Sequence, residues 1–217
     1  MSTTLYPLFL SLQGRGCVVV GGNETAEAKV RELLDAGAGV RVIASAVSEQ
    51  IRAWSKAGKL RWEARCYKTG DLNNAFLVVS VADAETNARV FEEAEMRHIL
   101  CNAVDDIHHC NCYASAVVRR GPLQIAISTS GQSPALAQRL RKELEGRFGV
   151  EYAPWVKSLG KLRSRLFQDR AIDAESRRTI LHEQASASAF ECFQKSLKEE
   201  ITDQTSGAAS DGCTKSP

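Results

Sequence analysis

The sequence predicts an α/β protein that begins with a parallel sheet covered by helices on both faces. Between residues 16 and 102, short and nearly all-apolar runs alternate with amphipathic helical stretches, which is typical of strands that are buried on both sides. Glycines follow several of these stretches, as expected at turns. The composition, 44% hydrophobic and 25% charged, is that of a globular protein and excludes a collagen-like or wholly disordered chain.

The predicted elements of this first part follow in chain order. The apolar strand at 17–20 leads through Gly21 and Gly22 into a helix, which carries one apolar face and ends at Gly37. The other predicted elements are strands at 40–44, 60–64, 76–80 and 99–101 and helices at 46–57 and 84–95.

The pattern changes after residue 112. Two β-rich runs at 112–118 and 123–128 flank a Gly-Pro turn, and Ser133 and Pro134 mark the start of a helix that reaches about residue 147. A helical stretch with a break near Asp173 follows, and the polar end of the chain is expected to be disordered. The expected division is an α/β domain at 1–112, a central α+β domain at 113–148, a small helical domain at 149–200 and a tail at 201–217.

The chain shows no pattern of a membrane or secreted protein. It contains no apolar run of about 18 residues, and its first 20 residues lack the pattern of a signal peptide. We therefore expect a cytoplasmic location, where the seven cysteines, an odd number without a CxxC pair, stay reduced. The net charge of +2 gives no reason to expect nucleic-acid binding.

Charge is distributed unevenly along the chain. Residues 1–112 carry 12 basic and 14 acidic groups, whereas residues 113–147 carry 6 basic and 2 acidic groups. The middle segment is therefore the basic part of the molecule, and it either faces an anionic ligand or is a solvated surface. Its candidate anion-binding residues are Arg119, Arg120, Arg139 and Arg141.

The glycine turn after the first strand occupies the position of a dinucleotide-binding fingerprint. Such a turn brings the backbone and a helix N-terminus close to a pyrophosphate. The candidate cofactor-binding residues here are Gly21, Gly22, Asn23, Glu24 and Thr25. Ala26 fits the third position of the fingerprint, but Asn23 places a side chain where the second glycine is usual. A turn without any ligand is the alternative.

The end of the second strand indicates which cofactor is favoured. An acidic residue that would bind the ribose of NAD is missing, and only Ser45, followed by Ala46, offers a short polar group. No arginine marks a site for a 2′-phosphate, so NAD is favoured over NADP.

Asp105 follows the fifth predicted strand. The carboxyl ends of parallel strands are where doubly wound folds bind ligands, so this carboxylate would lie beside a bound nicotinamide. It could act as a general base or hold a metal ion. A loop aspartate that only caps a turn is the alternative.

Several stretches together resemble the precorrin-2 dehydrogenase family, which comprises stand-alone dehydrogenases and the N-terminal module of siroheme synthases. The stretches are Tyr6-Pro7-Leu8-Phe9, Val20-Gly21-Gly22, Ala26-x-x-Lys29, Cys101-Asn102-x-Val104-Asp105, Arg119-Arg120-Gly121-Pro122-Leu123 and Ile127-Ser128-Thr129-Ser130-Gly131-x-Ser133-Pro134-Ala135-Leu136-Ala137. The similarity covers residues 5 to about 147 with specific motifs and is looser to about 200.

The resemblance implies a fold and a function. It implies an NAD-binding Rossmann domain, a central dimerisation domain, a small helical domain and a homodimer. It implies the NAD-dependent oxidation of precorrin-2 to sirohydrochlorin, with the family's catalytic aspartate at Asp105; some members also insert Fe²⁺. Asn102 falls in a family motif and joins the candidate cofactor-binding residues, as does Val81 after the fourth strand. Ser128 and Thr129 fall in another family motif and join the candidate substrate-binding residues. Because precorrin-2 carries eight carboxylates, the four arginines of the basic segment are candidates to bind it.

The sequence departs from the family pattern at several positions. Asn23 stands for a glycine, Val81 and Ala82 stand for Thr-Asp after the fourth strand, and Thr129 stands for a serine that is modified in some members. The run His108, His109, Cys110 and Cys112 is unusual for the family. Its residue types suit a transition metal, whereas a surface loop with Cys112 packed inward is the alternative.

Three functions fit these features of the sequence. The leading one is a precorrin-2 dehydrogenase, with or without ferrochelatase activity. The alternatives are a chelatase whose NAD site is eroded and a non-catalytic tetrapyrrole-binding protein. The length of 217 residues leaves no room for a fused methyltransferase, so we expect a separate uroporphyrinogen-III methyltransferase to supply precorrin-2.

Overall fold

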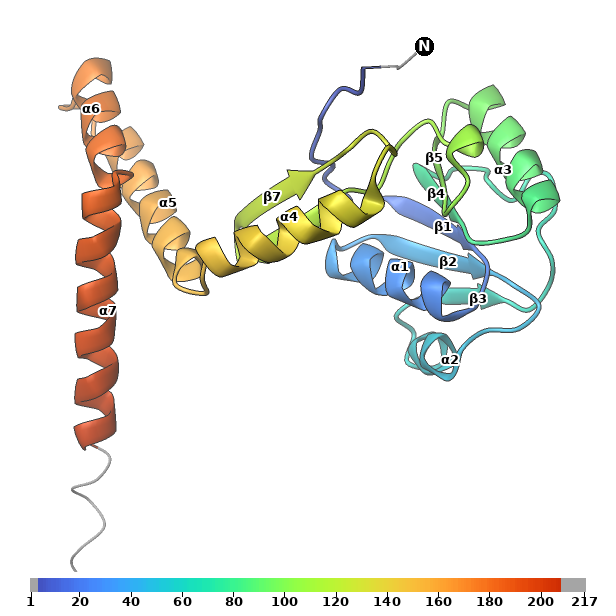
Figure 1. The fold of residues 1–217 in the computed structure, drawn as a ribbon, viewed down its shortest axis with the longest axis horizontal. Coiled ribbons are helices and arrows are strands. Elements are labelled where there is room, and N and C mark those ends of the chain that lie inside the picture. The colour runs from blue at the N-terminus through green and yellow to red at the C-terminus, as the bar shows by residue number, and fades with distance from the viewer. Residues whose placement is uncertain (1–3, 208–217) are drawn as a thin grey trace, which may run out of the picture. The chain divides into compact units, whose positions relative to one another are not determined.

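The computed structural model describes residues 4–207. Two compact units make up this part of the chain (Figure 1). The first unit holds the residues up to Ala114 together with Ser130–Ser133, and the second holds Ser115–Thr129 and the residues from Pro134 onward.

The first unit is a five-stranded parallel sheet of the Rossmann type. Its strands are β1 (Gly16–Val20), β2 (Gly39–Ile43), β3 (Arg61–Glu63), β4 (Leu77–Ser80) and β5 (Leu100–Ala103). Their order in the sheet is β3-β2-β1-β4-β5, and every pair is parallel. The predicted parallel sheet is therefore confirmed. Strands β2 and β3 lie on one side of β1 and strands β4 and β5 on its other side, so β1, between β2 and β4, is where the strand order switches.

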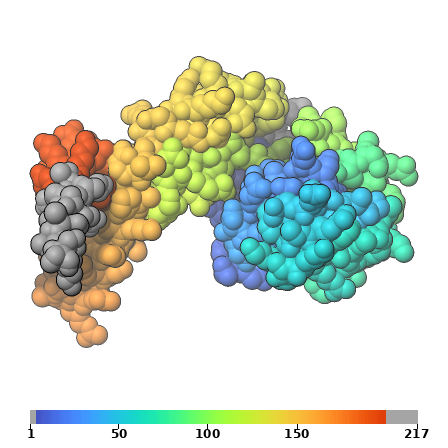
Figure 2. Space-filling view, turned by 90° about the horizontal axis from the view of Figure 1, so that it is seen from below, coloured from blue at the N-terminus to red at the C-terminus, as the bar shows by residue number. Residues whose placement is uncertain are grey.

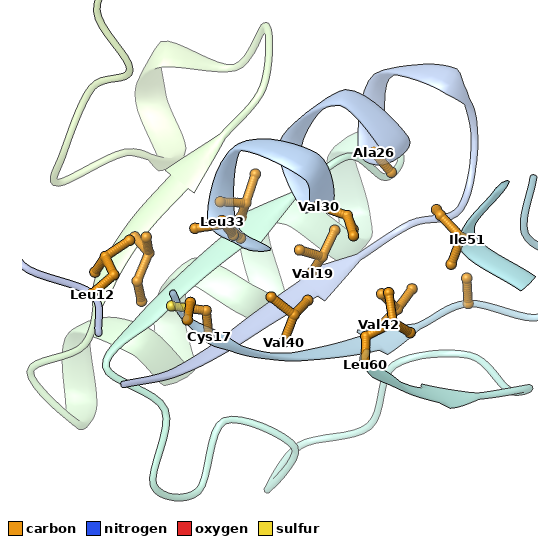
Figure 3. Close-up of a cluster of buried hydrophobic side chains, with 14 residues drawn as sticks. Leu12, Cys17, Val19, Ala26, Val30, Leu33, Val40, Val42, Ile51 and Leu60 are labelled. Atoms are coloured by element: carbon orange, nitrogen blue, oxygen red, sulfur yellow. The ribbon is translucent and has the colours of Figure 1, made fainter. Parts of the chain in front are cut away.

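Helices cover both faces of this sheet (Figure 1). They are α1 (Glu24–Asp35), α2 (Glu49–Lys56) and α3 (Ala84–Met96). Because side chains alternate along a strand, Val19 points to the face that α1 covers with Val30 and Leu33 (Figure 3). Val18 belongs to the cluster on the opposite face, which α3 closes with Val90. Burial of these apolar side chains on both faces is the main stabilising contribution to the unit.

The second unit joins a two-stranded ribbon to four helices. The antiparallel strands β6 (Ala116–Arg120) and β7 (Leu123–Ile127) are covered on one face by α4 (Pro134–Arg147), drawn in yellow over the ribbon in Figure 2. The helices α5 (Tyr152–Gln168), α6 (Ala174–Gln184) and α7 (Ala187–Gly207) follow. The break predicted near Asp173 is confirmed, because Asp173 caps α6 by accepting the amides of Glu175 and Ser176.

Three expected boundaries are wrong. Helix α2 begins three residues late, because the Ser48 hydroxyl accepts the Ile51 amide and so caps it there. Strand β6 begins at Ala116 rather than 112, because a short 3₁₀ helix, η1 (Ile107–His109), and a hydrogen-bonded loop occupy the preceding residues. Helix α7 continues through residues 201–207, where disorder was expected; this stretch joins a run of strong helix formers and contains no proline. The rest of the expected disordered tail, 208–217, lies outside the described residues.

Candidate functional site

The carboxyl ends of four strands lie level at one edge of the sheet. Val20 pairs with Ile43 on β2 and with Ser80 on β4, and Ser80 pairs with Ala103 on β5. The loops that follow these strands carry the predicted cofactor residues and Asp105. The structure therefore brings the glycine turn, Ser45, Val81 and Asp105 to the edge where doubly wound folds bind ligands, on both sides of the switch point at β1.

The glycine turn is packed between the two neighbouring strand ends. Gly21 has a φ of +122°, and a Cβ atom there would lie 2.4 Å from the Val81 carbonyl oxygen. A Cβ atom on Gly22 would lie 2.1 Å from the carbonyl oxygen of Ala46. Both glycines are thus required by the fold itself, so their presence alone does not distinguish a cofactor site from a bare turn.

Asn23 occupies part of the helix N-terminus. Its side-chain oxygen accepts the Ala26 amide at 3.0 Å and caps α1. The side chains of Asn23, Glu24 and Thr25 are exposed. A pyrophosphate would bind the free amides of the first helical turn, and the Asn23 side chain competes with it for one of them.

The loops after β2 and β4 place small side chains beside the glycine turn, where a dinucleotide would bind. Ser45 and Ala46 are exposed, which leaves the serine hydroxyl open to a ribose. Val81 is half-buried, and its amide donates to the Val20 carbonyl at 2.7 Å. The side-chain amide of Asn102 is used within the protein rather than offered to a cofactor, since it donates to the Cys112 carbonyl at 3.1 Å. Its assignment to the cofactor stays a prediction.

Asp105 is exposed and has a left-handed backbone, with a φ of +60°. It is the third residue of a turn in which the Asp106 amide donates to the Ala103 carbonyl at 3.3 Å. Just before it, the Val104 amide donates to the Ser80 carbonyl at 2.8 Å. The carboxylate of Asp105 therefore projects from the end of β5 into solvent, where a ligand can reach it.

Asp106 lies beside Asp105 and is half-buried. Its carboxylate is 2.7 Å from the His109 Nδ1 atom and accepts the Asn87 amide group at 3.4 Å. The hydrogen bond from His109 is the main reason that the pKa of the Asp106 carboxyl lies below its usual value. Asp106 was not among the predicted site residues, and neither was Asn87; a polar residue on the buried face of α3 was the signal that could have identified this pair.

The metal-site hypothesis for the His-Cys run is wrong in the part of the chain that the structure describes, where no three His, Cys, Asp or Glu side chains gather to hold a metal. His109 faces Asp106, His108 is exposed, and the Cys110 sulfur lies 3.2 Å from both the amide nitrogen and the carbonyl oxygen of Ala103. Cys112 packs against the core, and burial raises the pKa of its thiol to about 11. The donor atoms thus point in different directions, and Cys112 stays a protonated thiol.

The predicted substrate residues lie in the second unit, and most of them are used within it. Arg120 donates to the carbonyls of Glu145 and Phe148 at the end of α4. Arg139 pairs with Glu143, and Arg141 with Glu145, one turn along the same helix. Among the described residues, Arg119 is the one of the four whose guanidinium has neither a hydrogen bond nor an ion pair, and it is exposed on β6. Ser128 and Thr129 follow β7, exposed and half-buried respectively.

Two segments of the chain match known protein families. Residues 8–116 match the protein family described as "Putative NAD(P)-binding", and residues 120–147 match "Sirohaem biosynthesis protein central". The chain is 40% identical to siroheme synthase 1 of Pectobacterium atrosepticum over 161 residues, which are 74% of this chain and 34% of that protein. It is 39% identical to the siroheme synthase of Escherichia coli O157:H7 over 173 residues, which are 79% of this chain and 38% of that protein.

A solved structure is similar over almost the whole chain. The precorrin-2 dehydrogenase SirC superposes with a TM-score of 0.70 at 25% identity, covering 90% of this chain and all of SirC. The chain spans a little over a third of the length of the siroheme synthases that it matches. No helix within residues 4–207 is long and apolar enough to cross a membrane. The Rossmann sheet and the match over residues 8–116 show that the chain belongs to this NAD(P)-binding family, and its relatives include siroheme synthases and the precorrin-2 dehydrogenase SirC.

Proposed function

We propose that this protein oxidises precorrin-2 to sirohydrochlorin with NAD⁺ as the hydride acceptor. The observation that carries the proposal is the exposed carboxylate of Asp105 at the end of β5, level with the glycine turn that follows β1. The reaction removes a hydride and a proton from the substrate, and the exposed carboxylate of Asp105 is suited to accept the proton as a general base.

The residues at the sheet edge fit a dinucleotide. The first turn of α1 offers amides to a pyrophosphate, and the exposed Ser45 hydroxyl offers a hydrogen bond to a ribose. No arginine follows β2 before Arg52, which is part of α2, so NAD is favoured over a cofactor with a 2′-phosphate. NAD⁺, when bound there, supplies the hydride acceptor, and the protein supplies orientation and the base.

The central unit would bind the substrate's carboxylates. Arg119 is best suited of the four candidate arginines, because it is exposed and makes no hydrogen bond or ion pair with its guanidinium among the described residues. Arg120 instead donates to backbone carbonyls, and Arg139 and Arg141 pair with glutamates of α4. Ser128 and Thr129 stay candidate substrate residues. The β6–β7 ribbon also supports a homodimer, because α4 covers one of its faces and Val118 is still the single residue of its two strands that is buried. Its other apolar side chains are left for a second copy to cover.

Insertion of Fe²⁺ into sirohydrochlorin is the second candidate activity. It is favoured by the same exposed Asp105 carboxylate, which could accept pyrrole protons while the metal enters as a substrate. The supply of precorrin-2 by a uroporphyrinogen-III methyltransferase stays a prediction.

Anaerobic incubation with precorrin-2 and NAD⁺ tests the proposal. We expect the absorbance of sirohydrochlorin to rise with NAD⁺ and much more slowly with NADP⁺. Fe²⁺ or Co²⁺ is then added to the product. Metal uptake faster than in the protein-free control would add the chelatase activity. Uptake from supplied sirohydrochlorin without any oxidation of precorrin-2 would instead assign a chelatase only, and tight binding without either reaction would assign a non-catalytic tetrapyrrole-binding protein.

A further inference from the structure

Asp105 adopts a left-handed backbone conformation, with a φ of +60°, which is uncommon for residues other than glycine. The left-handed region is unfavourable for most residues that carry a Cβ atom, although aspartate tolerates it better than most. Among the described residues, none makes a hydrogen bond or ion pair with the Asp105 carboxylate. The side chain therefore cannot hold its own position, and the residues on either side of it must set the direction of the carboxylate.

The residues before Asp105 are fixed to the sheet. The Val104 amide donates to the Ser80 carbonyl at 2.8 Å, which continues the pairing of β4 with β5 by one residue. The Cys110 sulfur lies 3.2 Å from both the amide nitrogen and the carbonyl oxygen of Ala103. The chain thus enters the turn at a defined place.

The residue after Asp105 is fixed through its side chain. The Asp106 carboxylate accepts the Asn87 amide group at 3.4 Å and is 2.7 Å from the His109 Nδ1 atom. Phe91 of α3 packs edge-to-face against the His109 ring, with the two ring centres 5.8 Å apart. Asp106 is therefore held by α3 on one side and by η1 on the other.

The anchor of this arrangement is Ser80, which is fully buried. Its hydroxyl donates to the Asn87 side-chain oxygen at 2.7 Å, and Asn87 is only 3% exposed. Because that oxygen is engaged, the NH₂ group of Asn87 is the end that faces Asp106. Ser80 thus fixes Asp105 from both sides, through its carbonyl to Val104 and through its hydroxyl and Asn87 to Asp106.

We propose that Asp106, held by Asn87 and His109, is a positioning residue that sets the direction of the Asp105 carboxylate at the end of β5. The inference rests on the proposed catalytic role of Asp105. Asp106 acts through the backbone of the turn and needs no contact with the substrate. Loss of the Asp106 carboxylate would leave the candidate cofactor residues after β1 and β2 in place and would displace the Asp105 carboxylate.

Substitution of Asp106 tests the inference in the full-length protein with precorrin-2 and NAD⁺. Because a small misplacement of a catalytic group is costly, we expect Asp106→Ala to lower kcat by roughly 10- to 100-fold, with the KM for NAD⁺ changed by less than about twofold. Asp106→Asn keeps an oxygen that can accept both hydrogen bonds, so it should retain most of the activity. Asp173→Ala, which removes a helix cap in the other unit, is the matched control and should leave kcat unchanged.

A double-mutant cycle distinguishes positioning from a general structural effect. In a protein that already carries Asp105→Ala, adding Asp106→Ala should cause no further loss of kcat, because there is no carboxylate left to position. His109→Phe, which keeps an aromatic ring for Phe91, should lower kcat in the same direction and serves if Asp106→Ala does not fold. An equal loss in both backgrounds, or an unchanged kcat in Asp106→Ala, overturns the inference while the proposed function stands. A wild-type protein without dehydrogenase activity overturns both.

Discussion

At the residue scale, Asn23 is the position where this chain departs most clearly from a dinucleotide fingerprint. Its side chain caps α1 by accepting the Ala26 amide at 3.0 Å. A glycine there would leave that amide free for a phosphate and would remove the side chain from the path of the ligand. The residue thus stabilises the helix at the expense of the proposed cofactor site.

Asn23→Gly should therefore bind NAD⁺ more tightly than the wild type does. We expect the Kd from calorimetric titration to fall by about three- to tenfold, while the loss of the cap costs only a few tenths of a kcal/mol, as is usual for glycine at this position. Asn23→Ala is the matched control, since it removes the amide group but keeps a Cβ atom. An equal or higher Kd in the glycine variant would contradict this reading of the turn.

The cysteines differ sharply in their surroundings. Burial raises the pKa of the Cys17 thiol to about 11 and, as the largest cause, that of Cys101 to about 12, whereas Cys66 and Cys192 are exposed. Since the thiolate is the reactive form, iodoacetamide at pH 7.5 should modify Cys66 and Cys192 first among the six cysteines that the structure describes. Mass spectrometry of the native protein checks this order, and early labelling of Cys101 would show that the end of β5 opens readily.

At the element scale, a single buried carboxylate ties α3 to the loop before β4. Glu93 is 1% exposed and accepts hydrogen bonds from the Tyr67 hydroxyl, the amides of Gly70 and Leu72, and Arg97. Burial raises the pKa of its carboxyl, but the hydrogen bonds outweigh burial and hold the pKa below the usual value. A folded-state pKa below the unfolded one adds stability above the unfolded pKa and loses it as the pH falls through the folded pKa.

Glu93→Gln should therefore destabilise the protein in a pH-dependent way. At pH 7 we expect the free energy of unfolding to drop by about 2 kcal/mol, because charge-assisted hydrogen bonds are replaced by weaker ones. The difference from wild type should shrink below pH 4, as the native carboxylate becomes protonated. Urea unfolding at several pH values measures it, with Glu85→Gln on the exposed side of α3 as the control. A difference that stays constant with pH would refute the role of the charge.

The sequence predicted elements well wherever periodicity and caps agree. Strands β1, β2 and β4 are short apolar runs, and α1 and α3 carry one apolar face each, so their positions follow from pattern alone. The break at Ala185 and Ser186 between α6 and α7 was missed, because neither glycine nor proline marks it. The link from Ser80 to Asp106 was also missed, since Asn87 bonds both side chains only once α3 packs against the folded sheet.

At the scale of the whole molecule, the proposed chemistry is divided between two units. The candidate cofactor residues and Asp105 belong to the Rossmann unit, whose strand order places them at one edge. The arginines, Ser128 and Thr129 belong to the other unit. The net charge of +2 does not reflect this division, because it sums an acidic first half and a basic central segment.

The most direct measurement follows NADH and sirohydrochlorin together during anaerobic turnover of precorrin-2 by the wild type and by Asp105→Ala. We expect the wild type to form the two products in a one-to-one ratio. The variant should bind NAD⁺ with a Kd within about twofold of wild type but turn over at least about 100-fold more slowly, as for the loss of a general base. Equal rates in the two proteins, or sirohydrochlorin formed without NADH, would contradict the proposed dehydrogenase mechanism.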